Sequence, residues 1–373
     1  MESGIGALLR YMVEIGASDL HLKAMSVPGF RVDGRLRGAE EFGCLTPDRI
    51  RSMAHEIMTP RQRQIFETEK DIDFSHSIPS VARFRINVLC QRGTVSLVVR
   101  QIPDAIPELD DLGLPPVASE MCRKVRGMVL VTGPTGCGKS TTLAAMIDYI
   151  NTHREGHIIT MEDPLEFIHP DKRCFVTQRQ IGQDCSSFTQ ALRRALRQDP
   201  DVILVGEMRD LETISMALTA AETGHLVLGT LHTIGATATV DRVIDAFPNE
   251  AQEQARVALA TTLQGVISQV LLPRRDGGRV AAREILVATD GVRSLIRDGK
   301  TAQLGNLQQT GKSQGMLTLE QALADLVLHN TLTIDTALGA CNRPDELLKF
   351  LEQRGYQMPT DSAAAKSGAW RRA

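Results

Sequence analysis

Helical and strand-like patterns of apolar residues alternate over the first hundred positions. Within 4–16 the apolar residues recur at i, i+3, i+4, i+7 and i+8, the spacing of an amphipathic helix, at Ile5, Leu8, Leu9, Met12 and Val13. A second helical stretch is predicted over 46–70, with a break at Pro60. The chain therefore opens with helices that each have one face to bury.

Short β-type runs separate and follow these helices. A strand is predicted at 19–22, a hairpin at 30–36 that turns at Asp33-Gly34, and two strands at 83–89 and 95–100. Because helices mix here with antiparallel hairpins, residues 1–100 are predicted to form an α+β domain.

The pattern changes after a proline-rich stretch, 101–118, which is predicted to be a semi-rigid linker. Over 119–270, apolar β-type runs alternate with helical stretches, at 128–131, 158–159, 202–205 and 226–228. This alternation predicts an α/β fold with a mainly parallel sheet that is covered on both faces. From about Gln269 the chain looks helical, with a loop at 274–278, so 271–355 are predicted as a C-terminal helical region. The last segment, 356–373, is rich in Ala, Ser and Gly and is predicted to be a disordered tail.

Composition narrows the classes of function. With 42 Lys+Arg against 45 Asp+Glu and only 4% aromatic residues, the chain lacks the basic excess and the stacking residues of a dedicated nucleic-acid binder. No apolar run approaches the roughly 18–20 residues of a membrane span, and the first residues do not read as a signal peptide. The seven cysteines are scattered without a C-x-x-C pair, which predicts neither a disulfide framework nor a zinc site. A cytoplasmic protein without a transmembrane segment is expected.

A glycine-rich segment carries the first specific chemistry. It matches G-x-x-x-x-G-K-[ST], follows an apolar strand and precedes a helical stretch, and it reads Gly133, Pro134, Thr135, Gly136, Cys137, Gly138, Lys139, Ser140 and then Thr141. In such a loop the backbone N–H groups surround the β-phosphate of a nucleotide, and the helix N-terminus adds partial positive charge. Lys139 is expected to reach the β- and γ-phosphates of ATP, and the Ser140 hydroxyl to bind Mg²⁺.

Carboxylates follow two of the predicted strands. Glu162, Asp163 and Glu166 come after the second strand, and Glu207 comes after the third. In an open parallel sheet, groups beyond the carboxyl ends of the strands face the ligand crevice, so both clusters are expected on the γ-phosphate side. Gly206 stands where the usual Walker B aspartate might be, so Glu207 must act alone or through water. The alternative for such residues is helix capping.

Two histidines, His225 and His232, lie seven positions apart and bracket an apolar strand. Histidines near strands are often hydrogen-bonded structural groups, so the sequence by itself leaves a catalytic and a structural role open.

Four motifs together resemble the secretion-type ATPases: GPTGCGKST at 133–141, ITMEDPLEF at 159–167, RQDPDVILVGEMRD at 197–210 and TGHLVLGTLHT at 223–233. Within that group the chain is similar to the retraction motors of type IV pili, from the first helix to about Gly355. The resemblance implies a homohexameric ring of protomers with a PAS-like N-terminal domain and a RecA-like C-terminal domain. ATP would bind between the two domains, and its hydrolysis would rotate one against the other.

The resemblance also implies roles for individual residues. Glu166 would be the catalytic glutamate that activates water, Glu162 and Asp163 would help to organise the metal, and Glu207 would be the Walker B glutamate on the Mg²⁺ side. His225 and His232 fall on the family's histidine box.

Two arginine pairs complete the implied site. Arg85 and Arg100, on two strands of the N-terminal domain, match arginines that contact the γ-phosphate, and Arg193 and Arg197, at i and i+4 on one helical face, match a second pair. The alternative is a solvated basic face. One arginine that stabilises the transition state contributes about 10³–10⁵ in rate.

A final segment bears on the direction of the motor. Residues 291–298, GVRSLIRD, resemble the family's retraction motif AIRNLIRE, while Ile234-Gly235 replaces the usual Asn-Ser after the histidine box. The predicted function is pilus retraction and twitching motility, by the main motor or by an accessory paralogue.

The alternatives are a pilus assembly or type II secretion ATPase, which usually carries a tetracysteine element, and a non-catalytic ring partner. The implied partners are an inner-membrane platform protein and a paralogous ATPase. The motor would sit at the cytoplasmic face of the membrane.

Overall fold

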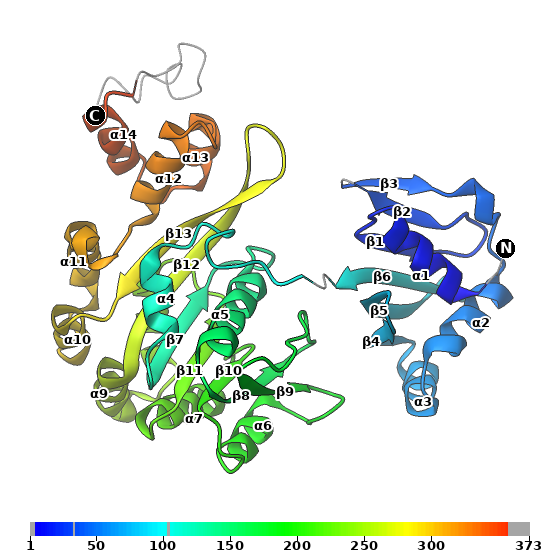
Figure 1. Cartoon of the computed structure of the whole chain (residues 1–373), viewed down its shortest axis with the longest axis horizontal. Coiled ribbons are helices and arrows are strands. Elements are labelled where there is room, and N and C mark those ends of the chain that lie inside the picture. Colours follow the sequence, from blue (N-terminus) through cyan, green and yellow to red (C-terminus); the bar gives the residue numbers. More distant parts are fainter. Residues whose placement is uncertain (1–3, 33, 103–104, 357–373) are drawn as a thin grey trace. The chain divides into compact units, whose positions relative to one another are not determined.

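The chain divides near residue 105 into two units. The computed structural model describes residues 4–32, 34–102 and 105–356 (Figure 1). Unit 1 comprises Met1–Ala105 together with Pro164–Ile168, and unit 2 comprises Ile106–Asp163 and His169–Ala373. Of the predicted disordered tail, 356–373, all but Tyr356 lies outside the described residues.

Unit 1 is built on a six-stranded antiparallel sheet in the order β3-β2-β1-β6-β5-β4. Its strands are β1 (Asp19–Leu22), β2 (Gly29–Val32), β3 (Arg35–Gly38), β4 (Asp71–Ile78), β5 (Ala82–Gln91) and β6 (Thr94–Ile102). The predicted hairpin at 30–36 is confirmed as β2–β3, although Asp33 of its turn lies outside the described residues. Strand β4 was not predicted, because only Phe74 along it is buried and the alternation of apolar residues is therefore weak.

Three helices accompany this sheet, α1 (Ile5–Glu14), α2 (Pro47–Ile57) and α3 (Pro60–Glu69). The apolar stripe of α1 is confirmed, since Ile5, Leu8, Leu9 and Met12 are each at most 2% exposed. The predicted break at Pro60 is confirmed as the start of α3, where proline occupies the first helical turn and Thr59 caps the helix. The predicted α+β character of this region is thus confirmed.

Unit 2 contains a seven-stranded sheet in the order β13-β12-β7-β11-β10-β8-β9. All strands are parallel to their neighbours except β13. The strands are β7 (Gly127–Thr132), β8 (Gly156–Glu162), β9 (Cys174–Gln180), β10 (Val202–Val205), β11 (Leu226–Leu231), β12 (Leu263–Pro273) and β13 (Arg279–Val287). The predicted mainly parallel sheet is confirmed.

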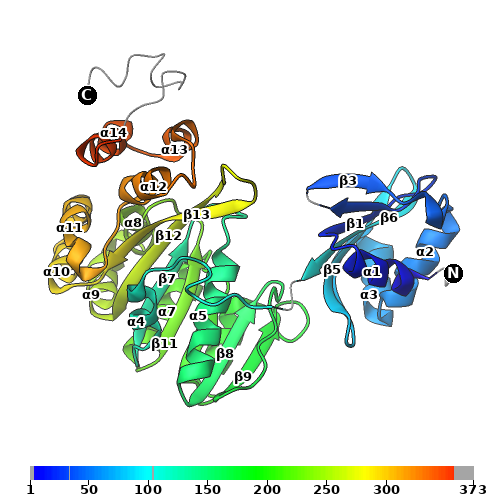
Figure 2. The same cartoon turned by 45° about the horizontal axis from the view of Figure 1, so that its top comes forward.

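Helices cover both faces of this sheet (Figure 2). Alternate residues of β7 belong to different cores: Met128 and Leu130 pack in one cluster, Val129 and Val131 in another. The first cluster includes residues of α6 (Phe188–Ala195), α7 (Leu211–Glu222), α8 (Ala236–Asp245), α9 (Gln252–Thr262) and α10 (Asp290–Arg297). The second includes residues of α4 (Pro116–Cys122) and α5 (Lys139–His153). Because β7 is buried on both sides, it forms a continuous apolar run in the sequence.

The prediction of helix from about Gln269 is wrong as far as Val287. Residues from Gln269 to Pro273 belong to β12, and β13 pairs antiparallel with it across the predicted loop at 274–278. The run Val270-Leu271-Leu272 is too short for periodicity to separate a strand from a helix. The helical region begins at α10 and continues through α11 (Leu304–Thr310), α12 (Leu319–Leu328), α13 (Ile334–Ala340) and α14 (Pro344–Gln353).

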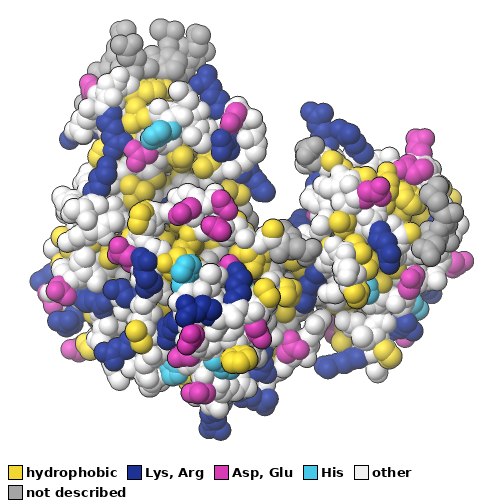
Figure 3. All heavy atoms as spheres, viewed as in Figure 1, with side chains coloured by type: hydrophobic (Ala, Val, Ile, Leu, Met, Phe, Trp, Pro, Cys, Tyr) yellow, Lys and Arg dark blue, Asp and Glu magenta, His cyan; other side chains and the backbone are white. Residues whose placement is uncertain are grey.

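Acidic and basic side chains lie interspersed over the face of unit 2 drawn in Figure 3. Among the described residues, no helix is both long and apolar enough to cross a membrane.

Candidate functional site

The carboxyl ends of four strands in unit 2 meet at one edge of the sheet. Thr132, the last residue of β7, pairs with Leu231, the last residue of β11. One strand further along, Val205 of β10 pairs with Gly229 of β11 and with Met161 of β8. The residues that follow these ends are the phosphate loop, His232, Glu207 and the carboxylates after β8. The fold therefore collects the predicted motifs at this carboxyl edge.

The phosphate loop needs glycine where the sequence supplies it. Gly133, Gly136 and Gly138 have φ angles of +136°, +78° and +92°, which residues with a side chain rarely adopt. A Cβ on Gly133 would also lie 2.2 Å from the carbonyl oxygen of Gln269. These glycines let the backbone turn sharply between β7 and α5, whose first residue is Lys139.

Gln269 of β12 braces this loop from the neighbouring strand. Its amide nitrogen donates to the Cys137 carbonyl at 2.8 Å, and its amide oxygen accepts from the Thr142 hydroxyl at 2.9 Å. The side chain is 1% exposed. Sequence reasoning missed Gln269, and the one available signal was a polar residue beside an apolar run.

Lys139 folds back onto its own loop. Its ammonium group donates to the Gly133 carbonyl at 2.9 Å and to the Pro134 carbonyl at 3.1 Å, and Nδ1 of His232 lies 3.5 Å away. The neighbouring Cys137 is buried, and burial raises the pKa of its thiol, so it remains a neutral thiol at physiological pH.

Glu207 lies between His232 and Arg209. Nε2 of His232 is 2.9 Å from Oε1 of Glu207, and Nη2 of Arg209 donates to Oε2 at 2.7 Å. The contact with a carboxylate places a proton on Nε2 of His232, which leaves Nδ1 as the acceptor facing Lys139. Burial by itself would raise the pKa of Glu207, but the hydrogen bond and charge of Arg209, followed by those of His232, lower it. Glu207 is therefore held ionised, and Arg209 is a second residue that the sequence reasoning missed.

Glu162 is the last residue of β8, and Asp163 and Glu166 follow it in the chain. Glu162 accepts a hydrogen bond from the Thr160 hydroxyl at 2.7 Å, and the Asp163 side chain is exposed and close enough for its charge to raise the pKa of Arg209. Glu166 belongs to the segment Pro164–Ile168, which groups with unit 1, and its side chain is exposed. Its role as the catalytic glutamate stays a prediction.

His225 lies at the opposite edge of the sheet from the phosphate loop. It precedes β11 whereas His232 follows it, and a six-residue strand is about 20 Å long. Its Nδ1 is 2.9 Å from the Ala220 carbonyl, and its own carbonyl accepts from Gly127 N–H at 3.0 Å. The strand between the two histidines thus separates them, and the catalytic role of His225 stays a prediction.

The arginine pairs lie in different units. In unit 1, Arg85 and Arg100 face each other across β5 and β6. Arg100 donates through Nε to the buried Asp19 at 2.9 Å, and Arg85 lies 3.8 Å from Asp73. Burial would raise the pKa of Asp19, but hydrogen bonds from Ser18 and Arg100 lower it.

In unit 2, Arg193 pairs with Glu212 at 2.8 Å, both largely exposed. Arg197 does not lie on the same helical face as predicted, because α6 ends at Ala195 and Arg197 lies in the turn that follows.

The residues resembling the retraction motif lie on α10. Arg293 donates to the carbonyls of Ala260 and Thr261 in the last turn of α9, at 2.6 and 2.9 Å, while Val292 and Ile296 are buried. Arg297 is exposed. One arginine of the motif thus joins two helices and the other faces solvent.

The donor set of the carboxyl edge fits a nucleotide with its magnesium ion. The loop and the first turn of α5 offer N–H groups and an ammonium to phosphate, and Ser140 and Glu207 offer hard oxygen ligands. Among the described residues, no three or more His, Cys, Asp or Glu side chains form a cluster that could hold a metal by themselves.

The chain matches the family model of the type II/IV secretion system protein over residues 1–277. It belongs to this family. The type IV pilus retraction ATPase PilT of Pseudomonas aeruginosa is 48% identical over 341 residues, which cover 91% of this chain and 99% of that protein. The type IV pilus ATPase PilU of the same species is 40% identical over 341 residues, which cover 91% and 89%.

Solved structures agree with this membership. A crystal structure of the pilus retraction motor PilT with bound ADP superposes with a TM-score of 0.88 at 47% identity, covering 93% of this chain and 99% of that one. These similarities confirm the predicted α/β fold, the resemblance to pilus retraction ATPases and the class of enzyme, a P-loop ATPase.

Proposed function

We propose that this protein is the motor that couples ATP hydrolysis to the retraction of type IV pili. The observation that carries the proposal is the contact set of Lys139, His232 and Glu207 beside an intact phosphate loop. It occurs in a chain that covers 99% of the retraction ATPase PilT at 48% identity. The chain thus combines an ATPase site with a match to nearly the whole length of that relative.

The phosphates of ATP would bind in the loop Gly133–Thr141. Its N–H groups and the N-terminus of α5 supply partial positive charge. Lys139 now donates to two carbonyls, and an anionic phosphate is a stronger acceptor, so the ammonium would move to the β- and γ-phosphates.

Ser140 and Glu207 would hold the magnesium ion, with Glu162 and Asp163 ordering its waters. When bound, Mg²⁺ neutralises charge on the β- and γ-phosphates. The lowered pKa of Glu207 supports this role, because a metal ligand must be ionised. His232 would keep the Glu207 carboxylate oriented through its Nε2 proton.

Glu166 would activate the attacking water. As the water oxygen forms its bond to the γ-phosphorus, the bond from that phosphorus to the bridging oxygen of ADP breaks, and the water proton passes to the Glu166 carboxylate. Arg85 and Arg100 of unit 1 and Arg193 and Arg197 of unit 2 would compensate the developing charge. Because the pairs belong to different units, hydrolysis would couple to a movement between them.

The working form would be a homohexamer at the cytoplasmic face of the inner membrane, docked on a platform protein of the pilus machine. The absence of a membrane-spanning helix from the described residues is compatible with peripheral association.

ATP turnover of the purified wild type, Lys139→Ala and Glu166→Gln tests the chemistry. Both variants are expected to lose turnover by about 10²-fold or more. Unchanged turnover in Glu166→Gln would contradict its assignment as the catalytic glutamate. Deletion of the gene tests the direction: abundant, non-retracting pili are expected, and sparse pili would contradict retraction.

An accessory retraction ATPase is the second candidate, favoured by the 40% identity to PilU over 91% of the chain. Complementation separates the two. If this protein is the main motor, it should restore twitching to a strain that lacks its main retraction ATPase. If it is an accessory paralogue, it should restore twitching only to a strain that still has the main motor.

A further inference from the structure

A polar network links the loop after β11 to the neighbouring strands of the sheet. We define the histidine loop as residues 232–235, between β11 and α8. Thr239 in the first turn of α8 contacts the Thr233 hydroxyl at 2.7 Å and the Thr132 hydroxyl at 3.2 Å. Since Thr132 directly precedes the phosphate loop, the position of the histidine loop is tied to the nucleotide site.

The start of α8 receives its cap from two other strands. Its N-cap residue is Gly235, which has φ +94° and no side chain with which to cap the helix. Instead, Ser268 of β12 accepts from Gly235 N–H at 2.9 Å, and Glu284 of β13 accepts from Ala236 N–H at 2.9 Å. A negatively charged acceptor at a helix N-terminus also interacts favourably with the helix dipole. Glu284 thus fixes the end of the histidine loop.

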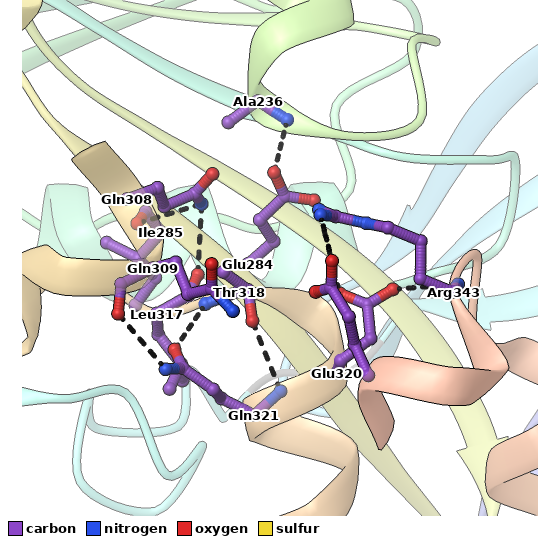
Figure 4. Close-up of polar contacts among 11 residues, drawn as sticks. Ala236, Glu284, Ile285, Gln308, Gln309, Leu317, Thr318, Glu320, Gln321 and Arg343 are labelled. Carbon is purple, nitrogen blue, oxygen red and sulfur yellow. Dashed lines mark hydrogen bonds and ion pairs between the residues drawn. The ribbon is translucent and has the colours of Figure 1, made fainter. Parts of the chain in front are cut away.

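Glu284 also faces the C-terminal helices (Figure 4). Burial raises the pKa of Glu284 and the charge of Glu320 of α12 raises it further, whereas the hydrogen bond from Ala236 N–H and the charge of Arg343, the N-cap residue of α14, lower it. Glu320 is 1% exposed and accepts from Arg343 N–H at 3.1 Å. The guanidinium of Arg343 lies 4.0 Å from Glu320. The same guanidinium pairs with Glu346 at 2.7 Å, so the ionic partners of Arg343 are Glu320 and Glu346.

We propose that Glu284 is a positioning residue for ATP hydrolysis, which holds the histidine loop in place. In this role Glu284 acts through the backbone and not through contact with substrate or metal. It fixes Ala236, and with it the loop that carries His232 to Glu207. The inference rests on the proposed ATPase function.

The expected effect of each substitution depends on whether it keeps the oxygen atom that accepts from Ala236 N–H. Glu284→Ala leaves the Ala236 N–H without its acceptor, and turnover (kcat) is expected to fall about five- to tenfold. The KM for ATP should change by less than about twofold, because the phosphate loop itself is untouched. Glu284→Gln keeps an oxygen acceptor and should restore kcat to within about twofold of the wild type. Ser268→Ala, which removes the acceptor of Gly235, should lower kcat in the same way by about two- to threefold.

Glu253→Ala, an exposed carboxylate on α9, is the matched control and should equal the wild type. Melting temperature and ADP binding of each variant report its folding.

Two outcomes would overturn the proposal. One is wild-type kcat in Glu284→Ala, and the other is a Glu284→Gln variant as slow as Glu284→Ala. If Lys139→Ala is inactive in the same assay, such results overturn the role of Glu284 and leave the ATPase function intact. An active Lys139→Ala would instead overturn the proposed function itself.

Discussion

The two edges of the seven-stranded sheet carry the same residue types with different partners. Strand β10 has Asp201 before it and Glu207 after it, and β11 has His225 before it and His232 after it. At the amino edge, both side chains bond to backbone: Asp201 accepts from His157 N–H at 2.8 Å, with a longer ion pair to Arg154 at 3.4 Å, and the ring of His225 lies 2.9 Å from the Ala220 carbonyl. At the carboxyl edge, Glu207 and His232 contact each other, with Arg209 and Lys139 beside them.

The difference shows how a parallel sheet separates support from chemistry. A side chain that satisfies a fixed backbone group has its hydrogen bonds committed in every state of the protein. Ionisable side chains that contact one another can exchange partners when a phosphate or a metal arrives. The carboxyl edge therefore suits catalysis, and the amino edge stabilises the fold. This distinction can be tested by substituting the same type of residue at the carboxyl edge and at the amino edge.

The largest contrast is expected between two lysines. Lys139→Ala removes the ammonium that would reach the β- and γ-phosphates, and ATP turnover should fall about 10³-fold. Lys124 is exposed just before β7, at the amino edge, and Lys124→Ala should leave turnover within about twofold. A phosphate-release assay on both proteins measures the contrast, and comparable losses in the two variants would break it.

The two carboxylates that flank β10 come next. Glu207→Ala removes the ionised acceptor between His232 and Arg209 and should reduce turnover about 10²-fold. Asp201→Ala removes the acceptor of His157 N–H and should lower the free energy of unfolding by about 1 kcal/mol without lowering turnover. Turnover and denaturant unfolding are measured on each variant. A slow Asp201→Ala with unchanged stability would contradict the assignment of edges.

The histidines that flank β11 should differ less. His232→Phe removes the contact with Glu207 and should reduce turnover about tenfold. His225→Phe removes a hydrogen bond to a backbone carbonyl, so its effect should appear in the melting temperature, with turnover within about twofold. Equal losses of turnover would show that His225 also acts in catalysis, for example across a subunit boundary.

The smallest expected effect is on stability against pH. The pKa of Glu207 is lowered in the fold, so its ionised form stabilises the protein above the ordinary pKa of 4.5. That contribution is lost as the pH falls from about 4.5 through the lowered pKa. Because Glu207 is only partly buried, the contribution should stay below about 1 kcal/mol. Glu207→Gln should therefore have a lower melting temperature than the wild type at pH 7 and approach it near pH 4; a difference that grows toward low pH would contradict this sign.

Predictability followed burial in both units. The strands β7, β8, β10 and β11 were predictable because a strand that is buried on both faces consists of consecutive apolar residues. Strand β9 was not predicted, because it is the outermost strand of the sheet and only Cys174 and Gln180 along it are buried. Strand β12 was not predicted either, because the three adjacent apolar residues at its end, 270–272, fit a strand and a helix equally well.

The site was predictable where one short segment contains its own chemistry. The phosphate loop is such a segment, since its glycines, Lys139 and Ser140 act within a few positions of one another. Gln269 and Glu284 were not predictable, because each acts on a backbone group far away in the chain, the Cys137 carbonyl and the Ala236 N–H. The sequence around each of these two residues contains no pattern that predicts the backbone group it contacts.

The sequence by itself determined a phosphate-binding loop between a buried strand and a helix, the family, and the residue types available for hydrolysis. Only the tertiary structure decided which of those residues meet. Side chains that precede and follow the same strand lie about 20 Å apart, and parallel pairing collects one set at each edge. His232 follows β11 and therefore contacts Glu207, which follows the neighbouring strand β10. His225, seven positions before His232 in the chain, lies at the opposite end of β11.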